Sequence, residues 1–140
     1  MSATGQETVR VVARKNLFEV GAPFDFDEEA DHVTALEYCL GALGAELVGG
    51  VKRRAESRRM DVEHVEAVVH GELNDSLAAI GVVGAKGHPG IERISVSVYV
   101  SSGETEAELE RLWREVLETS PLLRTLQVAT RVEVTFQVAL

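Results

Sequence analysis

The stretch YCLGALGAELVGGV (residues 38–51) carries four glycines and a single charge, on Glu46. Just before this stretch, Thr34 and Glu37 have the three-residue spacing of a capping box, which predicts a helix that runs to about Arg58. Because the stretch is apolar nearly all round, this helix is expected to be buried. Glycines weaken a helix, so four of them indicate close packing against another backbone. A lone carboxylate in such a segment calls for a specific explanation.

The whole chain has 140 residues, which suits one domain with a core and is short for two, so residues 1–140 are predicted to form a single domain. An apolar content of 45% with 26% charged residues indicates a globular protein. The net charge of −9 argues against nucleic acid or an anionic membrane as the main partner. No segment has the uncharged length of a membrane span, and the first residues lack a secretory signal pattern, so a cytoplasmic location is expected.

Alternating apolar and polar residues predict the strands on either side of this helix. A hairpin is expected over residues 8–20, with its turn at Lys15-Asn16, and half-buried strands over 62–73, 94–101 and 127–139. Residues 74–90 hold four glycines and are expected to form a loop. Thr105 and Glu108 form a second capping box, and Ser120-Pro121 should end that helix and start a short one. The order β-β-α-β-β-α-α-β predicts an α+β protein with mostly antiparallel strands.

The common motifs for metals and cofactors are missing from the sequence. GVVGAKG (residues 81–87) lacks the Gly-Lys-Ser or Gly-Lys-Thr ending of a phosphate loop. The four histidines have no metal-ligand spacing with the single cysteine, Cys39. The basic run KRRAESRR (residues 52–59) is interpreted as a solvated last turn that favours the helix dipole, with an anion site as the alternative.

Four residues stay as candidates for chemistry: Glu37, Cys39, Glu46 and Ser120. Three of them have an ordinary explanation as well, because Glu37 and Ser120 suit helix caps and a free cysteine such as Cys39 is usually a small buried hydrophobe. Cys39 and Glu46 are two helical turns apart, so they share a face roughly 10 Å apart along the axis.

Two of these positions fall on a pattern that resembles the OsmC/Ohr family, the osmotically inducible and organic-hydroperoxide-resistance proteins. The family's central helix reads approximately P-x-E-x-x-x-x-A-x-x-x-C, and a later helix end reads C-P-V. TALEYCLGALGAEL aligns with the first and SPLL with the second, and the resemblance covers about residues 30–140. It implies an OsmC-like fold with a mostly antiparallel sheet, a long buried central helix and a second C-terminal helix. It also implies an intertwined homodimer with two sites at the subunit interface.

Members of that family act in the oxidative stress response and reduce hydroperoxides with two cysteines. The first becomes a sulfenic acid, and the second closes a disulfide that a dithiol reduces. In this sequence the first position is Glu46 and the second is Ser120, while Glu37 matches the family's glutamate. Arg10 and Arg14 are the candidates for its activating arginine. Because neither a carboxylate nor a serine can run this cycle, we expect a hydroperoxide reductase homologue that lacks thiol peroxidase activity.

Two functions from different classes are therefore carried forward. The first is a dimeric binding or interaction protein with a small apolar ligand at the subunit interface. The second is an enzyme with altered chemistry, in which Glu46, removed from water, acts as a general base within hydrogen-bonding distance of Ser120. A one-cysteine peroxidase that uses Cys39 is a further alternative. No cofactor, metal, nucleic acid or membrane is expected to take part.

Overall fold

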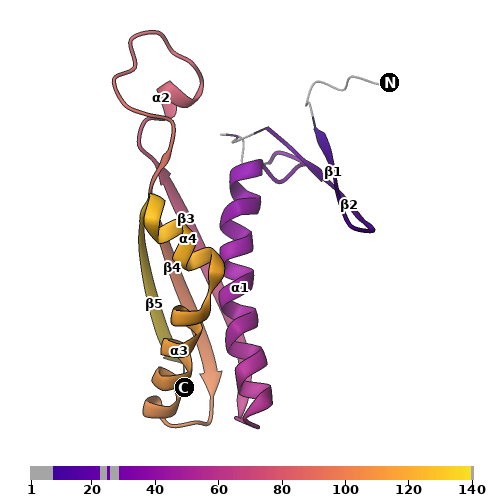
Figure 1. Cartoon of the computed structure of the whole chain (residues 1–140), viewed down its shortest axis with the longest axis vertical. Coiled ribbons are helices and arrows are strands. Elements are labelled where there is room, and N and C mark those ends of the chain that lie inside the picture. Colours follow the sequence, from indigo (N-terminus) through magenta and orange to yellow (C-terminus); the bar gives the residue numbers. More distant parts are fainter. Residues whose placement is uncertain (1–7, 23–24, 26–28, 140) are drawn as a thin grey trace. The chain divides into compact units, whose positions relative to one another are not determined.

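The computed structural model describes residues 8–22, 25 and 29–139. The chain divides into two compact units, Met1–Ala42 and Leu43–Leu140, which are described separately below. Its helices and strands confirm the predicted α+β class (Figure 1). In chain order they are β1 (Val9–Ala13), β2 (Asn16–Val20), α1 (Ala35–Ser57), β3 (Val62–Leu73), α2 (Ser76–Ala79), β4 (Ile91–Ser102), α3 (Glu106–Thr119), α4 (Pro121–Ala129) and β5 (Arg131–Ala139).

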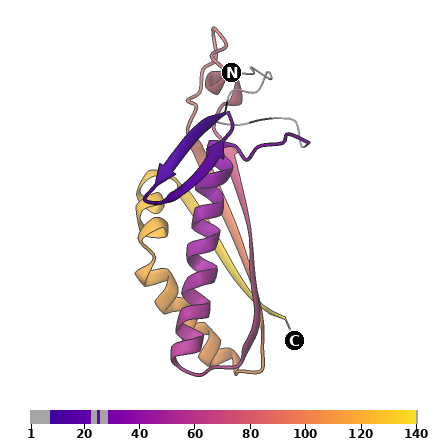
Figure 2. The same cartoon turned by 90° about the vertical axis from the view of Figure 1, so that its right-hand side faces the viewer.

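The first unit contains the predicted hairpin, in which β1 and β2 pair antiparallel with Val9 opposite Val20. Its turn lies at Arg14 and Lys15, one residue earlier than predicted, and Arg14 adopts a φ of 57°. A tyrosine of α1 contacts β2, since the Tyr38 hydroxyl donates to the carbonyl of Glu19 at 3.1 Å. Figure 2 shows the hairpin as a short two-stranded ribbon. Five residues between β2 and α1 in the sequence, 23–24 and 26–28, lie outside the described residues.

The start of α1 is fixed by the capping box that the sequence predicts. The Thr34 N–H donates to Oε2 of Glu37 at 2.8 Å, and the Glu37 N–H donates to Oγ1 of Thr34 at 3.2 Å. These two bonds satisfy helix N–H groups that have no partner inside the helix. At the other end, Arg59 takes a left-handed φ of 55° and the Met60 N–H bonds back to the carbonyl of Ala55 at 2.9 Å. This arrangement is a Schellman motif, and it ends the helix within one residue of the prediction.

At two of the four glycines another element packs closely against α1, although a side chain and not the predicted backbone makes the approach. A Cβ added at Gly44 would lie 3.0 Å from the side chain of Val69 on β3. One added at Gly50 would lie 3.0 Å from the side chain of Val116 on α3. Both approaches belong to the second unit, where they let α1 lie close against a strand and a helix.

Among the residues that the structure describes, this chain alone supplies no such packing at the other two glycines. A Cβ at Gly41 would meet nothing within 4 Å, and one at Gly49 would meet only the side chain of Arg53 from the same helix. Burial of α1 is also one-sided, because its buried residues start at Leu43 and recur at the spacing of a single helix face. The residues that the structure describes therefore cover only one face of a helix that is apolar nearly all round.

The second unit is built on a three-stranded sheet in the order β3-β4-β5. β4 is antiparallel to β3 and parallel to β5, so two of the three strand pairs in the described part of the chain are antiparallel, as predicted. The helices α3 and α4 lie over one face of this sheet (Figure 1). On that face Trp113 of α3 stacks on Phe136 of β5 with ring centroids 4.8 Å apart. The buried residues of β4 recur at every second position, at 94, 96, 98 and 100.

Two predicted element boundaries need correction. The strand expected from residue 127 begins at Arg131, because residues 127–129 continue α4. The loop over 74–90 contains the short helix α2, which Asp75 caps by accepting from the N–H groups of Leu77 and Ala78. The pKa of Asp75 is lowered, first by the N–H of Gly87 and then by these cap bonds. The segment is thus an ordered loop with a capped helical turn.

Candidate functional site

Ser120 lies at the junction of two helices and is only 4% exposed. It is both the C-cap of α3 and the N-cap of α4, and Pro121 occupies the first position of α4. The extended backbone of Ser120 (φ −81°, ψ 112°) suits a residue that precedes proline. Its Oγ accepts from the N–H of Leu123 at 3.2 Å. The Ser-Pro start signal read from the sequence is therefore confirmed.

Glu46 reaches this junction from α1. Its Oε1 accepts a short hydrogen bond from the Ser120 hydroxyl and a second bond from the Leu122 N–H at 2.9 Å. Glu46 itself is half-buried. The expected contact between Glu46 and Ser120 is confirmed, and it joins residues 74 positions apart in the sequence. A carboxylate at this place is favoured because the N-terminus of a helix carries partial positive charge.

The free N–H groups at the start of α4 are fully used by this arrangement. Pro121 has no N–H, Leu122 donates to Glu46, and Leu123 donates to Ser120. The Arg124 N–H makes the first bond inside the helix, to the carbonyl of Ser120 at 3.1 Å. A helix N-terminus can bind an anion or a developing oxyanion only with unpaired N–H groups. At this helix those groups serve the cap, and the Ser120 hydroxyl both donates and accepts within it.

The remaining candidates belong to the unit Met1–Ala42. The Glu37 carboxylate accepts the cap bond of α1, which is the role that its spacing alone suggests. Cys39 lies half-buried on α1 as a free thiol. Arg10 on β1 and Arg14 in the hairpin turn are both exposed. The pair that the structure brings together is therefore Glu46 with Ser120.

Ion pairs and a hydrogen bond also connect α1 with α3. They were not predicted, because residues 52–59 were interpreted as a solvated last turn. The Arg58 guanidinium forms a short ion pair with Glu115, and Arg54 lies 3.9 Å from the same carboxylate. Arg54 also donates a short hydrogen bond to the Thr119 hydroxyl. Two arginines of the basic run thus link α1 to the last turns of α3. The Thr119 hydroxyl that Arg54 contacts lies one residue before Ser120. In the sequence, the only sign of this contact is that acidic residues recur along α3 at helical spacing.

Within residues 8–22, 25 and 29–139, no group of three or more His, Cys, Asp or Glu side chains is placed to hold a metal ion. Over the same residues, no helix has the length and apolar character needed to cross a membrane.

The fold and the site together define an α+β protein in which one long helix brings an acidic side chain to the start of a Ser-Pro helix. The family model described as "OsmC-like protein" matches residues 28–135. The chain belongs to the OsmC-like protein family, as its resemblance implies. A sequence search of curated proteins finds no match.

Solved structures of this family share the fold. An OsmC-like protein from Mycoplasma pneumoniae superposes with a TM-score of 0.75 at 15% identity, covering 95% of this chain and 89% of that one. An OsmC-like protein of unknown function from Vibrio cholerae gives 0.66 at 15% identity, covering 95% and 99%. The organic hydroperoxide resistance protein OsmC from Legionella pneumophila gives 0.59 at 13% identity and covers both chains fully (100%). At such identities the likeness establishes the fold alone, which this chain shares with these three proteins.

Proposed function

We propose that this chain is a dimeric, cytoplasmic OsmC-like protein that binds a small apolar molecule at its subunit interface and does not reduce hydroperoxides. The observation that carries the proposal is the hydrogen bond between Glu46 and Ser120, the two residues that the resemblance aligns with the family's two cysteines. A carboxylate cannot pass through a sulfenic acid, and a serine cannot close a disulfide. The pair instead has a structural use, because it caps α4 and joins that helix to α1.

The same geometry argues against Glu46 as a general base and Ser120 as its nucleophile. A nucleophile must reach the substrate, yet Ser120 is 4% exposed. Acyl transfer also needs donors for the developing oxyanion, and the N–H groups of Leu122 and Leu123 already have acceptors. The altered enzyme is therefore the weaker of the two proposals.

Exposed apolar side chains on the hairpin support a homodimer. Val9, Val12 and Leu17 are 64%, 69% and 60% exposed, although each lies in a β-strand. A two-stranded hairpin alone is marginally stable in water, so an apolar one gains from a surface that covers it. A second copy of the chain would supply that surface at equal concentration.

The first test measures consumption of an organic hydroperoxide in the presence of a dithiol. Wild type and Cys39→Ser should both stay at the background rate. The double variant Glu46→Cys/Ser120→Cys should consume peroxide and form a disulfide, because it restores a cysteine at each of the two positions where the family resemblance places one. Turnover by wild type that Cys39→Ser abolishes would establish the one-cysteine peroxidase instead. Turnover that survives Cys39→Ser would support carboxylate chemistry.

The second test concerns assembly and ligand binding. Sedimentation should give a dimer for wild type and a larger monomer fraction for Val12→Asp. Val128→Asp is the matched control, because Val128 lies on α4 and is 90% exposed. Apolar small molecules should raise the unfolding temperature of the dimer, since a ligand that binds only the folded state stabilises it. A monomeric wild type would refute the dimer, and the lack of any thermal shift would count against the ligand.

A further inference from the structure

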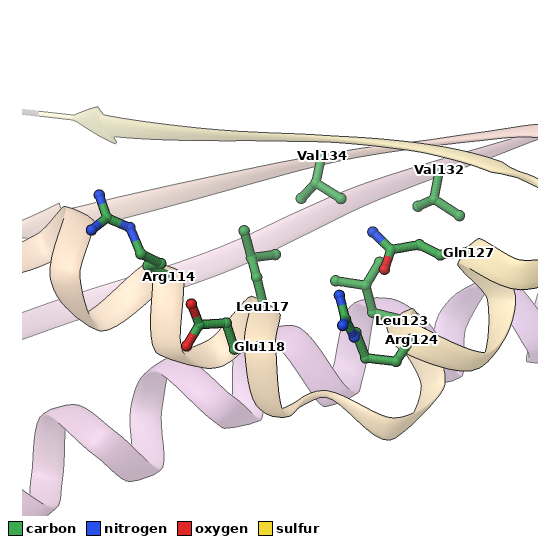
Figure 3. A pocket seen from close by; sticks show the side chains of 8 residues that line it. All are labelled: Arg114, Leu117, Glu118, Leu123, Arg124, Gln127, Val132 and Val134. Carbon is green, nitrogen blue, oxygen red and sulfur yellow. The ribbon is translucent and has the colours of Figure 1, made fainter.

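A groove in the second unit borders the Glu46–Ser120 pair but includes neither residue; Leu123, which lines the groove, donates its N–H to Ser120. It has a volume of about 400 Å³ and runs between α3, α4 and β5 (Figure 3). Its floor is aliphatic, with Leu117 from α3, Leu123 from α4, and Val132 and Val134 from β5. The volume falls within the range of small-molecule sites in proteins. An aliphatic floor without aromatic rings suits a flexible hydrocarbon chain.

Polar side chains stand at the edge of this floor (Figure 3). Arg124 and Gln127 are three positions apart on α4, so they project from one side of that helix. Arg114 and Glu118 are four positions apart on α3, where their opposite charges offset each other. The groove therefore has a net charge of one positive unit, concentrated at the α4 edge, in a chain whose net charge is −9.

The arginines of the groove differ from several others in the molecule. Arg58, Arg93 and Arg131 each pair with a glutamate. Neither Arg114 nor Arg124 makes a side-chain hydrogen bond or ion pair with any residue that the structure describes. Guanidinium groups are strong donors to carboxylates, and Arg124 has such donors free beside an apolar surface.

We propose that this groove binds an organic monocarboxylate with an unbranched aliphatic tail. The carboxylate accepts hydrogen bonds from Arg124 and Gln127, and the tail lies over Leu117 and the two valines of β5. The residues also exclude other ligand classes. A dianion such as a phosphate would be repelled by Glu118 with only one uncompensated arginine to hold it, and a cation would be repelled by Arg124. This site lies within one chain and does not depend on the proposed interface ligand.

The experiment titrates the full chain calorimetrically with decanoate below its micelle concentration. Three controls follow. Decanol keeps the tail but has no charge, and acetate keeps the carboxylate but has no long tail. Decyltrimethylammonium keeps the tail but carries a positive charge. Decanoate should bind about tenfold more tightly than decanol, since it adds a charge-assisted hydrogen bond. Acetate and the cation should not bind measurably. Equal affinities for decanoate and decanol would overturn the proposal.

Two variants locate the site. Arg124→Gln should weaken decanoate binding about tenfold, because it removes the charged donor. Arg111→Gln is the matched control, since Arg111 is an exposed arginine of α3 that does not line the groove, and it should bind as wild type does. Gln127→Leu gives a second measure should Arg124→Gln fold poorly, and it should weaken decanoate but spare decanol. Unchanged decanoate binding in both groove variants would refute the site, whereas peroxide turnover tests the proposed function independently.

Discussion

The helices α3 and α4 follow each other along the chain, yet their N-termini are capped in different ways. Thr105 and Glu108 cap α3 locally, with each side chain accepting from the other's backbone N–H at 3.3 Å. At α4, Ser120 caps locally but a second acceptor, Glu46, comes from α1, 76 positions before the N–H that it binds. A local cap stabilises one helix. The remote carboxylate also fixes one helix against another, so the two caps should differ in how much of the fold depends on them.

The largest effect is expected for Glu46→Ala. It leaves the Ser120 hydroxyl and the Leu122 N–H without their shared acceptor, which should lower the free energy of unfolding by about 3 kcal/mol. Urea unfolding followed by circular dichroism measures the change. Glu46→Gln is the control, because it keeps an acceptor oxygen and loses only the charge, and it should cost about 1 kcal/mol. A loss below that of Glu46→Gln would mean that the remote cap contributes little.

Ser120→Ala should follow, with a loss of about 2 kcal/mol from the missing N-cap and from one bond to a charged acceptor. The double variant Glu46→Ala/Ser120→Ala tests whether the two residues act as one unit. Side chains that share a hydrogen bond are coupled, so the double loss should be smaller than the sum of the single losses. Simple additivity would show that the two side chains do not depend on each other.

Thr105→Ala probes the local cap and should lower the free energy of unfolding by about 1 kcal/mol. Thr105 shares no hydrogen-bond partner with Glu46, so the two substitutions should be additive when combined. The same urea titrations measure both quantities. Coupling between these two sites would remove the distinction between a local and a remote cap.

The smallest effect concerns pH at the local cap. The Thr105 hydroxyl, followed by the Thr105 N–H, lowers the pKa of Glu108. A carboxyl group with a lowered pKa stabilises the fold above its usual titration range, and that contribution is lost as the pH falls through the lowered value. The difference in urea midpoint between wild type and Glu108→Gln should therefore be largest near neutral pH and shrink in acid. A difference that grows in acid would have the wrong sign for this account.

Local features of the fold follow from the sequence because their partners are close in the chain. Both capping boxes and the Ser-Pro start are examples, and the period-two pattern located β3 and β4. Residues 127–129 were assigned to a strand because QVATRVEV alternates throughout, although α4 extends over its first three residues. The helix that starts at Ser120 and Pro121 therefore includes these three residues, although their alternating pattern continues into β5.

The candidate site was predictable only in part. That Glu46 meets Ser120 came from the family resemblance, since a contact across 74 positions has no local pattern to mark it. The role of the Leu122 N–H could not be predicted, because any residue supplies a backbone N–H. The groove was not predicted either. Its lining comes from α3, α4 and β5, and in the sequence alone its arginines cannot be distinguished from ordinary surface charges.

The long separation between Glu46 and Ser120 has a consequence for the order of folding. During synthesis, Glu46 emerges from the ribosome well before Ser120, whose hydroxyl it contacts in the folded protein. Between the two events β3 and β4 emerge, and they can pair as neighbouring antiparallel strands. The remote cap of α4 must then close across a long loop, which places it late in folding. We therefore expect Glu46→Ala to accelerate unfolding more than it slows folding, so that this residue acts mainly on the lifetime of the finished protein.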